Sequence, residues 1–140
     1  MKKPLTDIHI KIIPQKEHRI PEYLGDYWEE DDGATVQIRA SNLGNWQMSM
    51  AVIEHELFEY LLSRDRGIEE PDILAFDINF ERERAEGLHG DHDEPGDDPQ
   101  CPCRVEHEAS NIFENLYLHE MGISQKEYND AIDAAWEAGK

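Results

Sequence analysis

Residues 46–63 restrict the fold of this chain most, because they predict an apolar helix that carries ionisable side chains inside it. Asn45 suits the N-cap of this helix, and apolar residues recur from Met50 to Leu62. His55 and Glu59 lie four residues apart, so a helix places both on one face. Burial of such groups is costly unless they are paired, hydrogen-bonded or bound to a metal ion. The rest of the fold must therefore supply partners for this helix.

The segment His55-Glu56-Leu57-Phe58-Glu59 has the spacing of a metal-binding helix. A catalytic zinc ion takes imidazole or carboxylate ligands about 2 Å away and keeps one position open for water. Glu56 projects about 100° round the helix from His55, where a carboxylate can take a proton from that water. The alternative is a solvated helix whose polar face contains Glu54, His55 and Glu59.

This segment resembles the H-E-x-x-H active-site helix of the zincin metallopeptidases, with Glu59 in place of the second histidine. The resemblance implies a metal-dependent peptidase in which His55 and Glu59 are ligands and Glu56 is the general base. Carboxylate is harder and less zinc-selective than imidazole, so iron and manganese are alternatives to zinc. The chain is also similar to uncharacterised phage- or prophage-type proteins that carry a His-Glu-Leu-x-Glu helix and an acidic Asp-Glu-Pro-Gly-Asp loop, here residues 93–97.

A third ligand must come from another part of the chain, because a catalytic zinc takes three protein ligands. His107 is the first candidate, since it lies early in a later predicted helix and shares a face with Glu114. Asp77 is the second, because it interrupts an apolar run in which a carboxylate needs a metal ion or a hydrogen bond. Asp77 and Glu81 are also four residues apart, which leaves a two-metal site open.

The acidic, Pro- and Gly-containing segment 88–102 contains a separate set of potential ligands. A structural zinc site there would use His89, His92, Cys101 and Cys103. The alternative is a solvated acidic loop with two reduced cysteines, because a disulfide between residues only two apart is strained. Tyr117 and His119 are candidates for stabilising an oxyanion in a hydrolytic reaction.

The remaining patterns predict one α+β domain over residues 1–140, in which a small antiparallel sheet precedes about four helices, as in compact zincins. Alternation predicts a first strand over residues 7–13, and Asp31-Asp32-Gly33 predicts a hairpin turn. The predicted elements are strands at 7–13, 26–30 and 34–40 and helices at 46–63, 71–87, 104–121 and 124–138. If the strand 34–40 lies at an exposed edge, it can align an extended peptide.

The composition restricts the partners. The net charge of −19, from 32 acidic and 13 basic residues, opposes direct binding to nucleic acid or to an anionic membrane. We expect a soluble, cytoplasmic protein, because the chain has no apolar run typical of a signal peptide or a membrane span. The alternative to a hydrolase of peptide or protein substrates is a non-catalytic acidic interaction protein, such as a DNA mimic or an inhibitor. The sequence does not indicate an oligomeric state.

Overall fold

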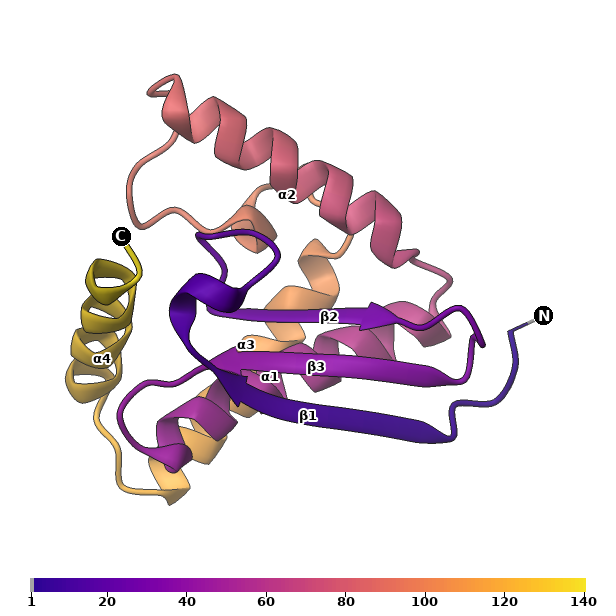
Figure 1. The fold of residues 1–140 in the computed structure, drawn as a ribbon, viewed down its shortest axis with the longest axis horizontal. Helices are drawn as coiled ribbons and strands as arrows, with labels where there is room; N and C mark the ends of the chain where they lie inside the picture. The colour runs from indigo at the N-terminus through magenta and orange to yellow at the C-terminus, as the bar shows by residue number, and fades with distance from the viewer. Residues whose placement is uncertain (1) are drawn as a thin grey trace.

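The computed structural model describes residues 2–140, in which a three-stranded sheet is followed by four helices in an α+β fold (Figure 1). The elements are β1 (Asp7–Ile13), β2 (Gly25–Glu29), β3 (Thr35–Ser41), α1 (Trp46–Asp65), α2 (Glu70–Ala85), α3 (Arg104–Glu120) and α4 (Gln125–Ala138), with short 3-10 turns at Gln15–Glu17 and Pro95–Asp97. Each predicted strand and helix is present with ends shifted by about two residues or fewer.

The sheet is mixed, so the prediction of an antiparallel sheet is wrong. The strand order is β1-β3-β2, and β1 runs parallel to β3 while β2 runs antiparallel to it. Alternation of apolar residues predicts a strand but not its direction. The connection 14–24 carries the chain past the position of β3, so β3 returns between the other two strands. The interior position of β3 also rules out the predicted use of residues 34–40 as a peptide-binding edge.

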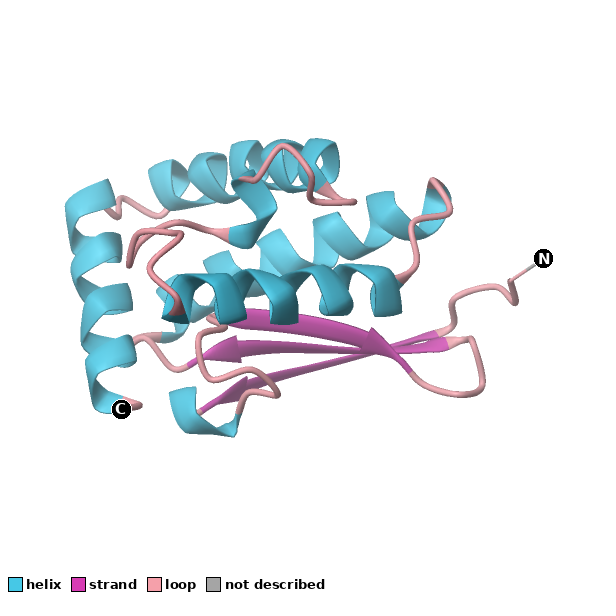
Figure 2. Cartoon of the chain, turned by 90° about the horizontal axis from the view of Figure 1, so that it is seen from above, coloured by secondary structure: helices cyan, strands magenta, loops and turns pink. Residues whose placement is uncertain are grey.

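The helices α1, α2 and α3 lie on one side of the sheet, and α4 stands beyond one end of the strands (Figure 2). The alternation in β3 explains which side of the sheet is buried. Val36, Ile38 and Ala40 are fully buried, as expected for the face that packs against helices. On the opposite face, the guanidinium groups of Arg19 and Arg39 lie 4.7 and 5.1 Å from the centroid of the Trp28 ring. These cation–π contacts cover part of the face that carries no helix within the described residues.

The strand β2 lies across α1 and fixes the register between sheet and helix. Tyr27 faces inward, and its hydroxyl donates a hydrogen bond to Glu59. Two residues earlier, Gly25 lies so close to α1 that an added Cβ would stand 2.6 Å from Cγ of Glu56. Two successive inward positions of β2 therefore meet side chains that lie about one turn apart on α1. The polar side of α1 is therefore held directly under β2.

Within the described residues, no helix combines the length and the apolar character needed to cross a membrane.

Candidate metal centre

Three side chains predicted as ligands converge in the structure: His55 and Glu59 of α1 and His107 of α3. Nε2 of His55 lies 3.0 Å from Nδ1 of His107, and Oε2 of Glu59 lies 3.2 and 3.1 Å from these two nitrogens. The three atoms form a nearly equilateral triangle. Ligand atoms about 2 Å from a tetrahedral zinc ion stand roughly 3.3 Å apart. The triangle therefore has the size required to hold a small divalent ion with only slight expansion.

Antiparallel packing of α1 and α3 brings the two histidines together. At one end Arg66 is paired with Glu106 at 2.7 Å, and near the middle the rings of Phe58 and Phe113 stack with centroids 4.4 Å apart. His55 and His107 lie edge to face with ring centroids 4.6 Å apart. The exposed fractions of these two residues and of Glu59 are 6–7%, so the triangle is removed from bulk water.

Carboxylates outside the triangle determine which ring nitrogens carry protons. Nδ1 of His55 lies 2.9 Å from Glu114, and Nε2 of His107 lies 3.2 Å from Glu94 and 3.3 Å from Asp97. A carboxylate only accepts hydrogen bonds, so these outer nitrogens carry the protons. In both neutral rings the lone pair then points into the triangle, toward Glu59. Metal-ligating histidines typically have such an outer carboxylate, which sets the tautomer and raises the basicity of the ligand.

The other oxygen of Glu59 is held by separate donors. Tyr27 donates to Oε1 at 3.1 Å, and the thiol of Cys103 lies 3.5 Å from the same atom. These contacts leave Oε2 directed at the two histidines. His107 is also fixed by the loop before α3, because a Cβ on Gly96 would lie 2.5 Å from its ring. Both ligands are therefore held in place by surrounding residues.

The electrostatics of the triangle favour positive charge. Burial lowers the pKa of His107, but its hydrogen bonds with Glu59 and Glu94 outweigh this effect and raise the pKa to about 10. In His55 burial is likewise outweighed by Glu114 and Glu59, which raise its pKa well above the ordinary value. Burial raises the pKa of Glu59, but the hydrogen bonds with His107 and His55 outweigh it and lower the pKa. Positive charge is therefore favoured here, as protons or as a metal ion.

Glu56 lies beside the triangle in a pocket of about 330 Å³, which His55, Glu59 and His107 also line. Its side chain is half-buried, and burial and neighbouring charges, not hydrogen bonds, dominate the environment of its carboxylate. Burial and the nearby charge of Glu59 raise the pKa of Glu56 well above the ordinary value for glutamate. A carboxyl group in this environment is suited to accept a proton and release it again.

The pocket is strongly acidic. Arg84 is the single arginine that lines it, with no lysine, whereas eleven aspartates and glutamates do: Glu22, Asp26, Glu56, Glu59, Glu70, Asp77, Glu81, Asp93, Glu94, Asp97 and Glu114. Such a lining concentrates cations and repels phosphate groups.

The structure does not bring Asp77 into the triangle. Its carboxylate lines the same pocket. The hydrogen bond that it accepts from the hydroxyl of Tyr23 gives this buried carboxylate the partner that it needs. Glu81 is paired with Arg84 at 2.7 Å. The described residues contain no group of close ligand atoms around these carboxylates, so the structure gives no support to a second metal at Asp77 and Glu81.

The loop residues predicted as a structural zinc site do not converge either. His89 stacks on Phe80 with centroids 3.8 Å apart, and His92 lies on the surface near Asp133. Cys101 and Cys103 are free thiols, with Sγ atoms 3.2 Å apart. Neither of the candidates for oxyanion stabilisation, Tyr117 and His119, lines the pocket.

Sequence reasoning missed the residues that hold the three candidate ligands in place: Tyr27, Glu94, Asp97 and, toward His55, Glu114. The spacing of seven residues between His107 and Glu114 was the one available signal, because it places both on the face of α3 that meets α1. Comparison of the chain with protein-family models, curated proteins and solved structures finds no match. The assignment of the site therefore depends on its geometry.

Proposed function

We propose that this chain is a zincin-like, metal-dependent hydrolase of peptide bonds in the cytoplasm. The observation that carries the proposal is the triangle of His55, Glu59 and His107, in which two histidine lone pairs and one carboxylate oxygen point at one place. Three such atoms repel one another unless protons or a metal ion lie between them, and a metal ion can take the place of the protons. Zinc is the favoured ion, and iron or manganese suits the carboxylate ligand as well.

The residues around the triangle have separate roles in this proposal. His55, Glu59 and His107 hold the ion, and Glu114, Glu94 and Asp97 keep the two rings oriented. A bound ion of this kind lowers the pKa of water and polarises a carbonyl group. Glu56 takes a proton from the attacking water on its free carboxylate and delivers it to the leaving amine.

The shape and charge of the pocket support a peptide as substrate. Residues 25–27 of β2 line the pocket, and β2 is paired on one side only, with β3. An extended peptide that displaces the Arg19 guanidinium from the carbonyl of Tyr27 can lie along this edge. Nucleic acid is disfavoured, because its phosphates would enter a site lined by carboxylates.

The test compares wild type with Glu56→Gln and His107→Ala, measuring metal content and cleavage of a mixed peptide library. We expect Glu56→Gln to keep its metal and to lose about 10²–10⁴-fold in turnover. His107→Ala should lose both metal and turnover. Glu120→Ala, an exposed residue on α3, is the control and should match wild type.

Two results would contradict the proposal in different ways. Bound metal without cleavage by wild type would refute the hydrolase and leave a metal-binding protein. Absence of bound metal after expression with ample metal would refute the site itself. That second result would favour a non-catalytic acidic interaction protein, which the net charge of −19 also suits.

A further inference from the structure

The strand β1 leaves one edge of the sheet unpaired. It pairs with β3 on one side only (Figure 1), and residues 7–12 are all exposed. Ile8, Ile10 and Ile12 keep exposed fractions of 42%, 43% and 40%. These three residues lie opposite Val36, Ile38 and Ala40 in the parallel register, so they extend the apolar face of the sheet beyond the area that the helices cover.

Natural sheets usually protect such an edge with proline, a bulge, inward-pointing charges or lysine side chains, and Lys11 is the single lysine of β1. Residues 7–13 contain no proline, and their pairing with β3 runs without interruption from Asp7 to Ile13. The inward side of β1 carries isoleucine at three alternate positions. The edge is therefore open to a further strand.

The backbone groups of the even-numbered residues are the ones available for pairing. Asp7 donates its N–H to Ala34 and the carbonyl of Ile13 accepts from Asn42, so odd-numbered residues bond toward β3. Successive residues of a strand direct their N–H and C=O groups to opposite sides. The groups of Ile8, Ile10 and Ile12 consequently point to the free edge.

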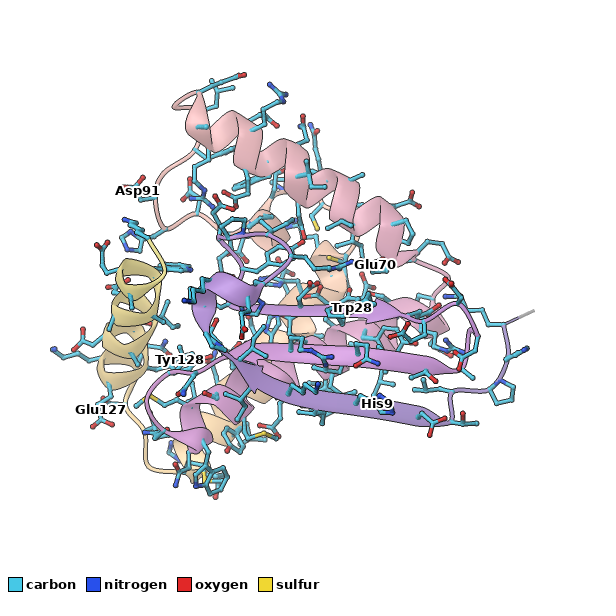
Figure 3. All side chains as sticks on the ribbon, in the orientation of Figure 1. His9, Trp28, Glu70, Asp91, Glu127 and Tyr128 are labelled. Atoms are coloured by element: carbon cyan, nitrogen blue, oxygen red, sulfur yellow. The ribbon has the colours of Figure 1, made fainter. Side chains whose placement is uncertain are left out.

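We propose that β1 pairs antiparallel with β1 of a second copy of this chain, with His9 on the two-fold axis. In this register Ile8 lies opposite Ile10 of the second copy, and Asp7 lies opposite Lys11 of the second copy. Figure 3 shows His9 on β1, the strand at this edge of the sheet. A shift that places Ile10 on the axis would set Lys11 opposite His9 instead. The charges therefore select the register centred on His9.

The local charge of this edge permits contact between two copies in spite of the net charge of −19. Residues 2–19 carry five basic residues (Lys2, Lys3, Lys11, Lys16 and Arg19) and two acidic residues (Asp7 and Glu17), a local balance of +3. The acidic groups lie mostly elsewhere, so the repulsion between two copies is weakest here. A strand pair alone buries little surface, so the dimer should be weak and dependent on concentration.

The first test is sedimentation velocity of the full chain from about 5 to about 500 µM, a range that suits a small interface. Wild type should shift from monomer to dimer. Asp7→Lys alone and Lys11→Asp alone place like charges opposite each other at two symmetric positions, and each should weaken the dimer about tenfold. The double variant Asp7→Lys with Lys11→Asp restores opposite charges and should recover dimerisation. These exposed positions are on the far side of β3 from the metal centre, so bound metal should not change.

A cysteine at position 9 tests the register directly. Two copies of His9→Cys would face each other in a non-hydrogen-bonded pair with Cα atoms about 4.5 Å apart, within the range of a disulfide. Mild air oxidation should therefore cross-link His9→Cys into a covalent dimer, while Lys11→Cys, which faces Asp7, should remain uncrosslinked. Monomer at all concentrations would overturn the proposal, as would a dimer that the single charge reversals leave intact.

Discussion

Removal of Glu114 tests whether the outer carboxylates orient the ligands. Glu114 accepts a hydrogen bond from Nδ1 of His55 at 2.9 Å and a second one from the hydroxyl of Tyr128. In Glu114→Ala the His55 ring can exchange its tautomer and rotate, so its Nε2 lone pair is no longer fixed toward the triangle. Loss of such a partner typically lowers metal affinity 10–100-fold, or about 1.4–2.7 kcal/mol.

The structure predicts a smaller effect at the other histidine. His107 Nε2 has two partners, Glu94 at 3.2 Å and Asp97 at 3.3 Å, and the Glu94 side chain is 51% exposed. Asp97 and water can replace Glu94, so Glu94→Ala should weaken metal binding less than tenfold. Glu114 is 16% exposed and has no such substitute at His55. The predicted order of affinity loss is therefore Glu114→Ala, then Glu94→Ala, then no loss for the exposed control Glu120→Ala.

The assay is a competition titration of zinc between each variant and a chromogenic chelator at pH 7.5, with circular dichroism to verify folding. Because Tyr128 loses its acceptor, Glu114→Ala should also be less stable by about 1–3 kcal/mol. If folded Glu114→Ala binds zinc as tightly as Glu120→Ala does, the assignment of the His55 tautomer, and with it the orientation of the triangle, is wrong.

Two further substitutions test the surroundings of the site. Gly96→Ala would place a Cβ 2.5 Å from the His107 ring, so we expect at least a tenfold loss of zinc affinity in the same titration. The control is Gly90→Ala, whose Cβ would lie 3.3 Å from the Asp93 carboxylate, and it should bind zinc like wild type. Burial raises the pKa of Asp77 to about 7 in the folded protein, above the value near 3.8 in the unfolded chain. The neutral carboxyl group therefore stabilises the fold fully below pH 3.8, and this contribution is lost as the pH rises through 7. Metal-free Asp77→Asn should therefore resist urea better than wild type at pH 8, by up to about 4 kcal/mol at 1.36 kcal/mol per pKa unit. This advantage should disappear near pH 4; an equal advantage at both pH values would show that ionisation of Asp77 is not its cause.

The helices and strands could be predicted because their capping residues and apolar patterns lie within the segments themselves. Asn45 caps α1 by accepting the N–H of Met48, and Ser124 caps α4 by accepting that of Glu127, as their sequences indicate. The direction of β1 could not be predicted, because alternation is the same in parallel and antiparallel strands. The long connection 14–24 decides it, and its path depends on tertiary contacts such as the hydrogen bond between Gln15 and Ser41.

The sequence predicted the three residues of the triangle, but not the side chains that surround them. His55 and Glu59 follow from a four-residue spacing, and His107 follows from the need for a third ligand. Asp77 was a candidate because a buried carboxylate needs a partner, but a tyrosine 54 residues away supplies that partner. Chain folding, not spacing, brings Tyr23 to Asp77 and Tyr27 to Glu59. Such pairs across elements have no signature in a single sequence.

Zinc K-edge X-ray absorption of the zinc-loaded protein tests the central claim most directly, because it identifies the ligand atoms. One zinc per chain, bound by two imidazole nitrogens and carboxylate oxygen at about 2.0–2.2 Å with no sulfur, is the predicted result. The His107→Ala variant should lose one imidazole from this pattern or fail to retain zinc. A sulfur shell at about 2.3 Å would place the ion at Cys101 and Cys103 instead. That result, or a chain that holds no stoichiometric zinc, iron or manganese, would contradict a metal centre at His55, Glu59 and His107.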